Sequence, residues 1–349
     1  MKDNKKDERN GVSAEMTVSF GFEGDFRSFR KNAKNRKLIL YKISERKLLH
    51  GKNECDTIFV KSITHKREIR RINMEPRIIF LDIDGTLTEP GGNEPPESAV
   101  RAIRRARERG HLVFLCTGRN YEMLSPLLKY GFDGFIGSSG GYIVCRDQVI
   151  YDCPMTEEQK GRAMEVLKRN GVFRTVECLN GSYTDEGFKE FLRKNAREGS
   201  NSELLRWREQ IEQSLNILPM EEYRGQPVYK IVIMSQSEKQ LEEPEKELGQ
   251  EFAFCIQGAD QYGFINGEII NRKFDKGRAV KRVCEHLQIP LRDTVSFGDS
   301  MNDIEMISTT GLSICMSNGN EQLKKIADDI CPTVREGGIH YAFRKYHLI

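Results

Sequence analysis

Two short stretches of the chain join apolar runs to carboxylates: IIFLDIDGT at 78–86 and VSFGDSMND at 295–303. Each predicts a buried strand with acidic side chains at its C-terminal end, where open α/β sheets bind their ligands. The carboxylates gathered there would be those of Asp82, Asp84, Asp299 and Asp303. They would repel one another without a cation, and Mg²⁺ is the natural cation for oxygen ligands beside a phosphate. The sequence therefore predicts metal-assisted phosphoryl chemistry.

The first stretch could divide the chemistry between two carboxylates. Asp82 and Asp84 lie two positions apart, and on a strand this spacing puts both side chains on one face. One carboxylate could attack phosphorus, while the other protonates the leaving oxygen and later activates water. Gly85 and Thr86 would then turn the chain and expose backbone N–H groups. A DxD pair alone is also common on solvated surfaces, so it indicates little by itself.

Three further signals stand at expected strand ends or helix starts. Thr117 and Gly118 offer a hydroxyl and a free N–H to phosphate oxygens. Lys276 could neutralise charge that develops on a phosphoryl group. Asp299 and Asp303 have the i, i+4 spacing that places two side chains on one side of a helix start. Each signal alone also fits an ordinary turn, a surface lysine or a first-turn carboxylate.

The elements that must position these residues alternate between strand and helix. The expected strands are 77–82, 111–116, 134–137, 142–145, 294–297, 311–314 and 329–331. The expected helices are 97–109, 121–129 with a bend at Pro126, and 276–287. This alternation predicts an α/β fold with a doubly wound, Rossmann-like parallel sheet.

The rhythm changes in the middle of the chain. Helices are expected at 156–170, 185–196, 203–215 and 237–248, and strands at 172–178, 227–234, 251–257 and 262–270. The last two strands are expected to pair through a Gly/Ala/Asp turn. We therefore expect a core domain formed by 74–153 and 269–349, with an α+β domain inserted at 154–268.

Residues 1–73 differ in composition from the rest. They contain 19 Lys and Arg against 10 Asp and Glu, which leaves the remainder of the chain net acidic although the whole has a charge of +3. Three interpretations stay open: a weakly ordered basic tail, a small nucleic-acid-binding appendage, or a segment outside the native protein if translation begins at Met74. The appendage is the least favoured, because charge runs are usually solvated, and no nucleic-acid partner is expected.

Bulk composition narrows the class of protein. The 349 residues suffice for two domains with their own cores. No apolar stretch approaches the roughly 20 residues of a membrane span, and the charged N-terminus lacks a secretory signal. The nine cysteines are scattered without a CxxC pair, which favours reduced thiols in a cytoplasmic protein.

The order of these motifs along the chain, and their positions at strand ends and helix starts, resemble those of the haloacid dehalogenase superfamily of phosphotransferases. The four motifs are DIDGT at 82–86, CTGR at 116–119, Lys276, and GDSMND at 298–303. The insertion between the second and third motifs and the tail SNGNEQLKKIAD at 317–328 resemble the Cof-type branch, subfamily IIB, with a C2 cap. The resemblance covers 75–349. This chain has Ser138-Ser139-Gly140-Gly141 where many relatives carry Asn-Gly, which leaves a substrate role of that loop open.

The resemblance implies a role for each matching residue. Asp82 would be the nucleophile and a Mg²⁺ ligand, and Asp84 the general acid/base with its backbone carbonyl on the metal. Thr117 and Gly118 would hold the phosphoryl group, and Lys276 would neutralise it together with Asp82. Asp299 would bind the metal directly. Asp303 would support the metal or orient Lys276, and Asn302 would touch the phosphate.

The implied function is a Mg²⁺-dependent phosphoric monoester hydrolase, acting through an aspartyl-phosphate on a small phosphorylated metabolite such as a sugar or cofactor phosphate. Two alternatives remain: a phosphomutase of the phosphomannomutase type and a non-enzymatic phospho-ligand sensor. We expect a monomer or weak homodimer without membrane association. The cap would choose the substrate, and the sequence does not rank its candidate contacts, which are Arg174, Tyr183, Tyr229 and Lys230.

Overall fold

The computed structural model describes residues 76–188, 190, 217–256 and 265–349. The interpretations of residues 1–73 lie outside the described residues, as do the helix expected at 203–215, most of that at 185–196, and the turn expected between 257 and 262.

The larger of two sheets has eight strands in the order β14-β13-β12-β1-β2-β3-β4-β5. Their bounds are β1 (Ile78–Leu81), β2 (Leu112–Cys116), β3 (Gly134–Gly137), β4 (Tyr142–Cys145), β5 (Gln148–Asp152), β12 (Thr294–Gly298), β13 (Leu312–Met316) and β14 (Asp329–Cys331). Strands β14 to β3 pair in parallel, whereas β4 and β5 join the edge antiparallel. The predicted α/β class with a parallel sheet is confirmed, and the antiparallel edge is an addition to it.

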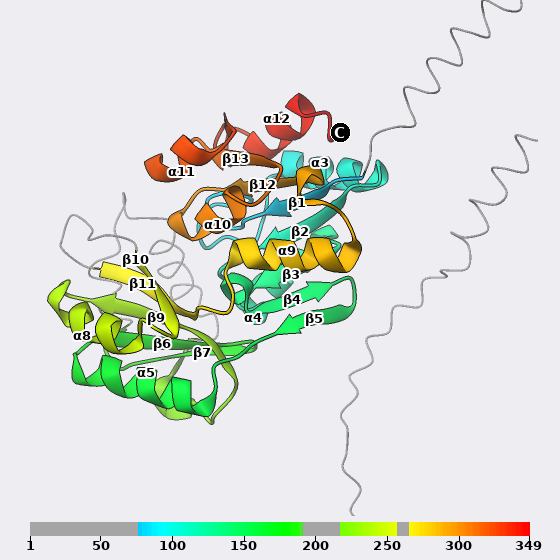
Figure 1. The fold of residues 1–349 in the computed structure, drawn as a ribbon. Coiled ribbons are helices and arrows are strands. Elements are labelled where there is room, and N and C mark those ends of the chain that lie inside the picture. The colour runs from blue at the N-terminus through cyan, green and yellow to red at the C-terminus, as the bar shows by residue number, and fades with distance from the viewer. Residues whose placement is uncertain (1–75, 189, 191–216, 257–264) are drawn as a thin grey trace, which may run out of the picture. The chain divides into compact units, whose positions relative to one another are not determined.

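Helices cover both faces of this sheet, as Figure 1 shows. On one face lie α3 (Glu97–Glu108) and α12 (Gly338–Lys345), and on the other α9 (Lys276–Leu287) and α10 (Ile304–Ile307). Ile79 and Leu81 of β1 pack into the apolar cluster that holds α3 and α12, while Ile78 and Phe80 pack toward α9. Burial on both faces explains why β1 is continuously apolar rather than alternating.

The helix expected at 121–129 is divided in the structure. It forms α4 (Tyr121–Leu124), capped by the Asn120 side chain, and then the 3₁₀ segment η1 (Ser125–Tyr130), which has Pro126 in its first turn. Proline has no backbone N–H and cannot continue the α-helical hydrogen-bond ladder, so the tighter helix begins there. The other short helical elements around the larger sheet are η2 (Ser138–Gly140), η4 (Leu291–Asp293), η5 (Met301–Asp303) and α11 (Glu321–Ile326).

The inserted segment forms a six-stranded sheet in the order β10-β11-β9-β6-β7-β8. Its elements are α5 (Glu157–Arg169), β6 (Phe173–Cys178), β7 (Gly181–Thr184), β8 (Ile217–Pro219), η3 (Met220–Glu222), β9 (Val228–Ser235), α8 (Lys239–Leu248), β10 (Phe252–Ile256) and β11 (Ile265–Asn271). Strands β10 and β11 pair antiparallel, as predicted. Helices α5 and α8 lie together on one face of the sheet (Figure 1), where Ile231 and Ile233 contribute to their shared core. Strands β7 and β8 were not predicted.

Within the described ranges, none of the helices has the length and apolar character needed to cross a membrane.

Candidate active site

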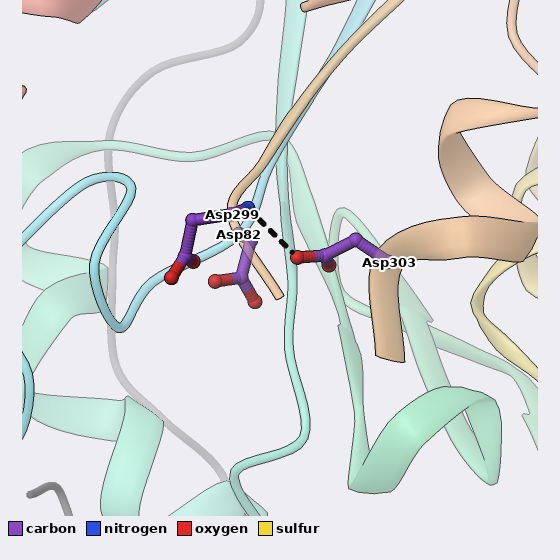
Figure 2. Close-up of side chains that lie close together, drawn as sticks. All are labelled: Asp82, Asp299 and Asp303. Carbon is purple, nitrogen blue, oxygen red and sulfur yellow. Dashed lines mark hydrogen bonds between the residues drawn. The ribbon is translucent and has the colours of Figure 1, made fainter. Parts of the chain in front are cut away.

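Three buried carboxylates meet at the C-terminal ends of two adjacent strands. Asp82 follows β1, Asp299 follows β12, and Asp303 lies at the end of η5. One carboxylate oxygen from each lies within 4.8 Å of the others. Figure 2 shows the carboxylates of Asp82 and Asp299 directed into the same space, with Asp303 facing them across it. The parallel pairing of β1 with β12 brings the two sequence motifs together.

Lys276 is the cation of this cluster. It opens α9, where the Asp275 side chain caps the helix, and its side chain is only 1% exposed. Its Nζ donates to Asp82 Oδ1 at 2.8 Å, to Asp303 Oδ1 at 2.6 Å and to Asn302 Oδ1 at 3.0 Å. The lysine thereby ties the motif after β1 to the motif after β12.

The cluster carries more negative than positive charge. Burial, and then the Asp303 carboxylate, raise the pKa of Asp82 to about 8 although Lys276 opposes the shift. Burial and the neighbouring Asp82 and Asp303 carboxylates also raise the pKa of Asp299 well above its usual value. Burial works to lower the pKa of Lys276, but Asp303 and Asp82 outweigh it and raise that pKa. Three carboxylates against one ammonium leave an excess that a proton or another cation would neutralise.

Asp303 lies beside Asp299 because of a capping turn, not because the two residues share a helix face. Asp299 precedes η5 and α10 instead of belonging to a helix, so the i, i+4 helical argument is wrong. Asp303 Oδ2 instead accepts hydrogen bonds from the backbone N–H groups of Asp299 and Ser300, both at 3.0 Å. Asp303 therefore caps the turn that carries Asp299, while its Oδ1 accepts from Lys276.

The turn after β1 approaches Asp299 closely. Gly85 has φ +83°, and a Cβ at this position would lie 2.5 Å from Asp299 Oδ2, so only glycine fits. Thr86 Oγ1 donates to Asp299 Oδ1 at 3.1 Å. The DIDGT motif thus orients the carboxylate of the distant GDSMND motif.

Asp84 lies apart from the carboxylate cluster. Strand β1 ends at Leu81, so the alternation that predicted Asp82 and Asp84 on one face does not extend to them. Asp84 is held by Arg119 in a two-pronged ion pair, with Nε to Oδ2 at 2.8 Å and Nη2 to Oδ1 at 2.7 Å. The backbone N–H of Gly91 also donates to Asp84 Oδ1, at 2.6 Å. Such a two-pronged pair fixes the orientation of the carboxylate.

Arg119 is the residue that sequence reasoning missed. Its side chain is 1% exposed and also donates to Asn93 Oδ1 at 2.6 Å and to the carbonyl oxygens of Gly92 and Met123. The available signal in the sequence is its position as the last residue of CTGR. A buried arginine at the end of an interior strand requires a carboxylate partner, and Asp84 is that partner.

Thr117, Gly118 and Asn302 surround the same strand ends. Thr117 follows β2 and is buried, and its Oγ1 accepts from the Arg119 backbone N–H at 3.1 Å, which leaves the hydroxyl proton available to a ligand. Asn302 Oδ1 accepts from Ser300 Oγ at 2.9 Å as well as from Lys276. The structure therefore gathers all of the sequence-predicted site residues at one edge of the sheet.

A cavity of about 360 Å³ opens beside Lys276 and Asn302. The inserted sheet contributes Ala253, Cys255, Glu268 and Ile270 to its wall, and the segment that leads into α9 contributes Arg272, Phe274 and Asp275. The other wall residues are Ser139 of η2, Arg278 of α9 and Glu305 of α10. A volume of this size suits a small metabolite.

The carboxylates fit a hard divalent cation. The donors are all carboxylate oxygens, and their combined charge exceeds that of Lys276. Soft metals prefer sulfur or imidazole ligands, and the cluster offers carboxylates alone. Asp84 contributes no side-chain oxygen to this group, because Arg119 and Gly91 hold both of them.

Comparison with known proteins agrees with this geometry. Residues 79–343 match the family model of haloacid dehalogenase-like hydrolases. The Bacillus subtilis protein YkrA is 28% identical over 280 residues, which are 79% of this chain and all of YkrA. Phosphatase YwpJ of the same organism is 25% identical over 78% of this chain and all of its own length. The HMP-PP phosphatase of Yersinia pestis (strain Pestoides F) is 25% identical over 71% of this chain and 86% of its own.

Solved structures share the fold. A hypothetical protein from Geobacillus kaustophilus HTA426 has a TM-score of 0.64 and 26% identity, over 79% of this chain and all of that one. The HAD subclass IIB sugar phosphatase BT4131 has a TM-score of 0.62 and 24% identity, over 78% of this chain and all of that one.

Proposed function

Because the chain belongs to the haloacid dehalogenase-like hydrolases, as a Cof-type phosphoric monoester hydrolase, we propose that it hydrolyses a small phosphorylated metabolite through an aspartyl-phosphate, with Mg²⁺ as its metal. One observation supports the proposal above all others. Lys276 binds both Asp82 and Asp303, near Asp299, and also lines a cavity of metabolite size. The residues that we propose as nucleophile, metal ligand and phosphate-neutralising cation are therefore close neighbours.

The metal would be held by the Asp82 and Asp299 carboxylates and by the backbone carbonyl of Asp84, with Asp303 supporting it. When bound, Mg²⁺ supplies Lewis-acid stabilisation of the phosphoryl oxygens and offsets their repulsion from Asp82. The carboxylate of Asp303 already accepts three hydrogen bonds, two from backbone N–H groups and one from Lys276. We therefore assign it mainly to orienting Lys276 and the Asp299 turn.

In the first half of the reaction, an Asp82 oxygen attacks phosphorus while the bond from phosphorus to the leaving oxygen breaks. Asp84, entering in its protonated form, gives its proton to the leaving oxygen, so the alcohol departs neutral. Lys276 and the Thr117 hydroxyl bind the transferring phosphoryl oxygens. The products of this half are the free alcohol, the Asp82 acyl phosphate and the Asp84 carboxylate.

In the second half, water attacks the phosphorus of the Asp82 acyl phosphate. Its proton passes to the Asp84 carboxylate, and the bond between phosphorus and the Asp82 oxygen breaks to release inorganic phosphate. Arg119 holds the Asp84 carboxylate through two hydrogen bonds, and the carboxylate is the form of Asp84 that accepts this proton. To donate a proton in the first half, Asp84 must weaken its ion pair with Arg119. The strength of this pair therefore affects how readily Asp84 acts as acid in the first half and as base in the second.

We assign residues 154–268 to a C2-type cap on a core formed by 74–153 and 269–349. The inserted sheet contributes Ala253, Cys255, Glu268 and Ile270 to the wall of the cavity, so it meets the substrate on the side away from the phosphoryl group. Relatives include a sugar phosphatase and an HMP-PP phosphatase by name, and both substrate classes are small and phosphorylated. The eight described cysteines are free thiols, in keeping with the proposed cytoplasmic location.

A phosphate-release screen of small phosphorylated metabolites tests this function. With Mg²⁺, we expect at least one sugar or cofactor phosphate to reach a kcat/KM of about 10⁴ M⁻¹s⁻¹, at the lower end of the range usual for enzymes. Chelation of the metal should remove the activity and Mg²⁺ should restore it. Absence of turnover across the screen, activity that survives chelation, or transfer of the phosphoryl group to a second sugar hydroxyl instead of water would contradict the proposal.

Mg²⁺ should stabilise the folded chain, and more strongly at pH 8 than at pH 6. The pKa of Asp82 is raised to about 8, so below that pH the metal-free site is protonated and a metal must displace the proton. Release of one proton weakens the apparent affinity roughly tenfold, or ~1.4 kcal/mol, for each pH unit below that pKa. Thermal unfolding with and without Mg²⁺ at both pH values measures the difference, with K⁺ at equal ionic strength as control. A shift of Tm that is equal at both pH values, or larger at pH 6, would show that Asp82 does not bind the metal.

A further inference from the structure

A second cavity, of about 670 Å³, lies where α3 and α12 begin, and it shares no wall residue with the cavity at Lys276. Both helices lie on the same face of the larger sheet (Figure 1). A Cβ built on Gly337 would lie 3.5 Å from Ser98 Oγ, so the first turns of the two helices meet at the cavity. Farther along, Arg109 Nη1 donates to the carbonyl oxygen of His347 at 3.2 Å. The helices therefore run side by side in the same direction, with the cavity between their first turns.

The wall of this cavity is basic. It contains the cationic side chains of Arg335, Arg344 and Lys345. Among the described residues of the wall, Glu336 is the only carboxylate, and its Oε2 accepts hydrogen bonds from the backbone N–H and the hydroxyl of Thr333 at 3.0 and 2.9 Å. The wall is therefore positive in a part of the chain that is net acidic as a whole. A concave surface of this charge attracts anions.

Two of these cations already have carboxylate partners. Lys345 Nζ pairs with Asp329 Oδ2 at 2.6 Å, outside the wall. Arg335 Nε lies 3.3 Å from Glu89 Oε1, and the side chains of this pair are 82% and 47% exposed. Ion pairs that are this exposed contribute little to stability, so a more highly charged anion can replace Glu89 at Arg335.

Arg344 and His340 are the donors that remain. Within the part of the chain that the structure describes, neither side chain forms a hydrogen bond or an ion pair. They are four positions apart in α12, which places them on the same side of the helix. Both lie in the wall of the cavity, so their N–H groups are free to bind a ligand there.

An exposed aromatic ring belongs to the same wall. Tyr341 is 48% exposed, and it is the only aromatic residue among the large hydrophobic side chains that are exposed in the described ranges. It lies three positions before Arg344, so the ring and the guanidinium are neighbours on the surface of α12. An exposed ring offers a stacking surface to a planar base, and a guanidinium binds phosphate oxygens through two parallel hydrogen bonds.

These features indicate a ligand only in combination. Arginines on an exposed helix face are usually just solvated. Here they stand in a cavity whose volume lies within the range of about 300–1,000 Å³ that is usual for small-molecule sites. An inorganic anion would leave the ring of Tyr341 without a partner, and an uncharged aromatic ligand would leave the cations unused. A ligand that carries both a base and phosphates would engage both.

We propose that this cavity is a second ligand site that binds a nucleoside phosphate, with the base on Tyr341 and the phosphates on Arg344 and Arg335. His340 and the hydroxyl of Ser98 donate to the remaining phosphate or ribose oxygens. The wall residues are separate from those around Asp82 and Lys276, so the proposal goes beyond the phosphatase function and does not depend on it.

Calorimetric titration of the full chain with ADP tests this site. A chelator is present throughout, so that metal-dependent hydrolysis does not consume the probe, and ADP represents the class because stacking tolerates every base. We expect a Kd of about 10–100 µM, and binding at least about 10-fold weaker for adenosine and for inorganic pyrophosphate, which each lack half of the ligand. Arg344→Gln should weaken ADP binding about 10- to 100-fold through the loss of charge-assisted hydrogen bonds. Tyr341→Ala should weaken it about 10-fold, whereas Tyr341→Phe, which keeps the ring, should not.

Arg104→Gln, a matched change at an exposed position of α3 outside the wall, should leave the affinity for ADP unchanged. Absence of ADP binding would overturn the proposal. So would an affinity that survives both Arg344→Gln and Tyr341→Ala, because the nucleotide would then bind elsewhere. Equal binding of ADP and pyrophosphate would show a general anion site in which Tyr341 has no part. Tighter binding of a single-stranded oligonucleotide, weakened by Arg104→Gln as well, would show an extended nucleic-acid surface instead.

Discussion

Replacing Asp82 by asparagine is expected to lower phosphate release by roughly 10⁴-fold or more, as removal of other covalent nucleophiles does. The amide has almost the shape of the carboxylate but is too weak a nucleophile to attack phosphorus, and it binds a hard cation less well. Asp82 is buried at the end of the central strand β1, where it shares Lys276 with Asp303, and no larger rearrangement is needed to accommodate an amide. Single-turnover and steady-state phosphate release in Mg²⁺ measure the loss.

The same substitution should leave the metal-free protein folded and at least as stable as the native chain at pH 7.5. The pKa of Asp82 is raised to about 8 in the folded state, so ionisation of this group makes the fold less stable as pH rises from about 4 toward 8. Asparagine removes that penalty. Asp147→Asn, in the exposed turn between β4 and β5, is the matched control and should keep full activity. A purified Asp82→Asn protein that retains more than a tenth of the native rate would contradict the nucleophile assignment, and a clearly lower Tm would contradict the electrostatic account.

The sequence predicted the part of the fold where burial leaves a clear pattern. Strand β1 is apolar at every position because α3 and α12 cover one face of the sheet and α9 the other. The helix predicted at 276–287 begins and ends where α9 does, because its apolar residues repeat at helical spacing and Asp275 caps its start. Strong patterns of this kind arise from local geometry, so one sequence suffices to detect them.

Short strands and one exposed edge strand escaped prediction. Strand β5 is mostly exposed at the edge of the larger sheet and shows no apolar alternation. Strands β7 and β8 are short, and β8 follows residues that the sequence assigned to a charged helix. These strands have only 5, 4 and 3 residues. Segments this short show too little periodicity to distinguish a strand from a turn.

Within the site, residue types were easier to predict than contacts. The sequence placed Asp82, Asp299 and Asp303 near one another, but a capping turn rather than a helix face brings Asp303 to Asp299. It did not pair Asp84 with Arg119, because a contact across 35 positions depends on how β1 and β2 lie in the sheet. Likewise, alternation along β9 indicates which residues share a face with Lys230, yet not which face the helices cover.

Replacing Lys276 by methionine is expected to be the most damaging change to both stability and turnover. The native lysine neutralises part of a buried cluster of three carboxylates, and methionine would leave Asp82, Asp299 and Asp303 without a cation. Removing one partner of a buried ion pair typically costs about 3–5 kcal/mol, so the metal-free variant should unfold at a markedly lower denaturant concentration. Loss of a charge aimed at the transferring phosphoryl group should lower kcat about 10²–10³-fold.

Added Mg²⁺ should distinguish the contribution of Lys276 to stability from its contribution to turnover. A divalent cation can replace the missing charge near Asp82 and Asp299, so Mg²⁺ should stabilise the Lys276→Met variant more than it stabilises the native chain. It should not restore turnover, because under the proposed mechanism the lysine also binds the transferring phosphoryl oxygens, which a metal held by Asp82 and Asp299 would not replace. Lys281→Met, at an exposed position of the same helix, should change neither quantity. Equal Mg²⁺ stabilisation of variant and native chain would show that Lys276 and the metal do not share one electrostatic site, and recovery of activity by Mg²⁺ alone would show that the lysine serves only the fold.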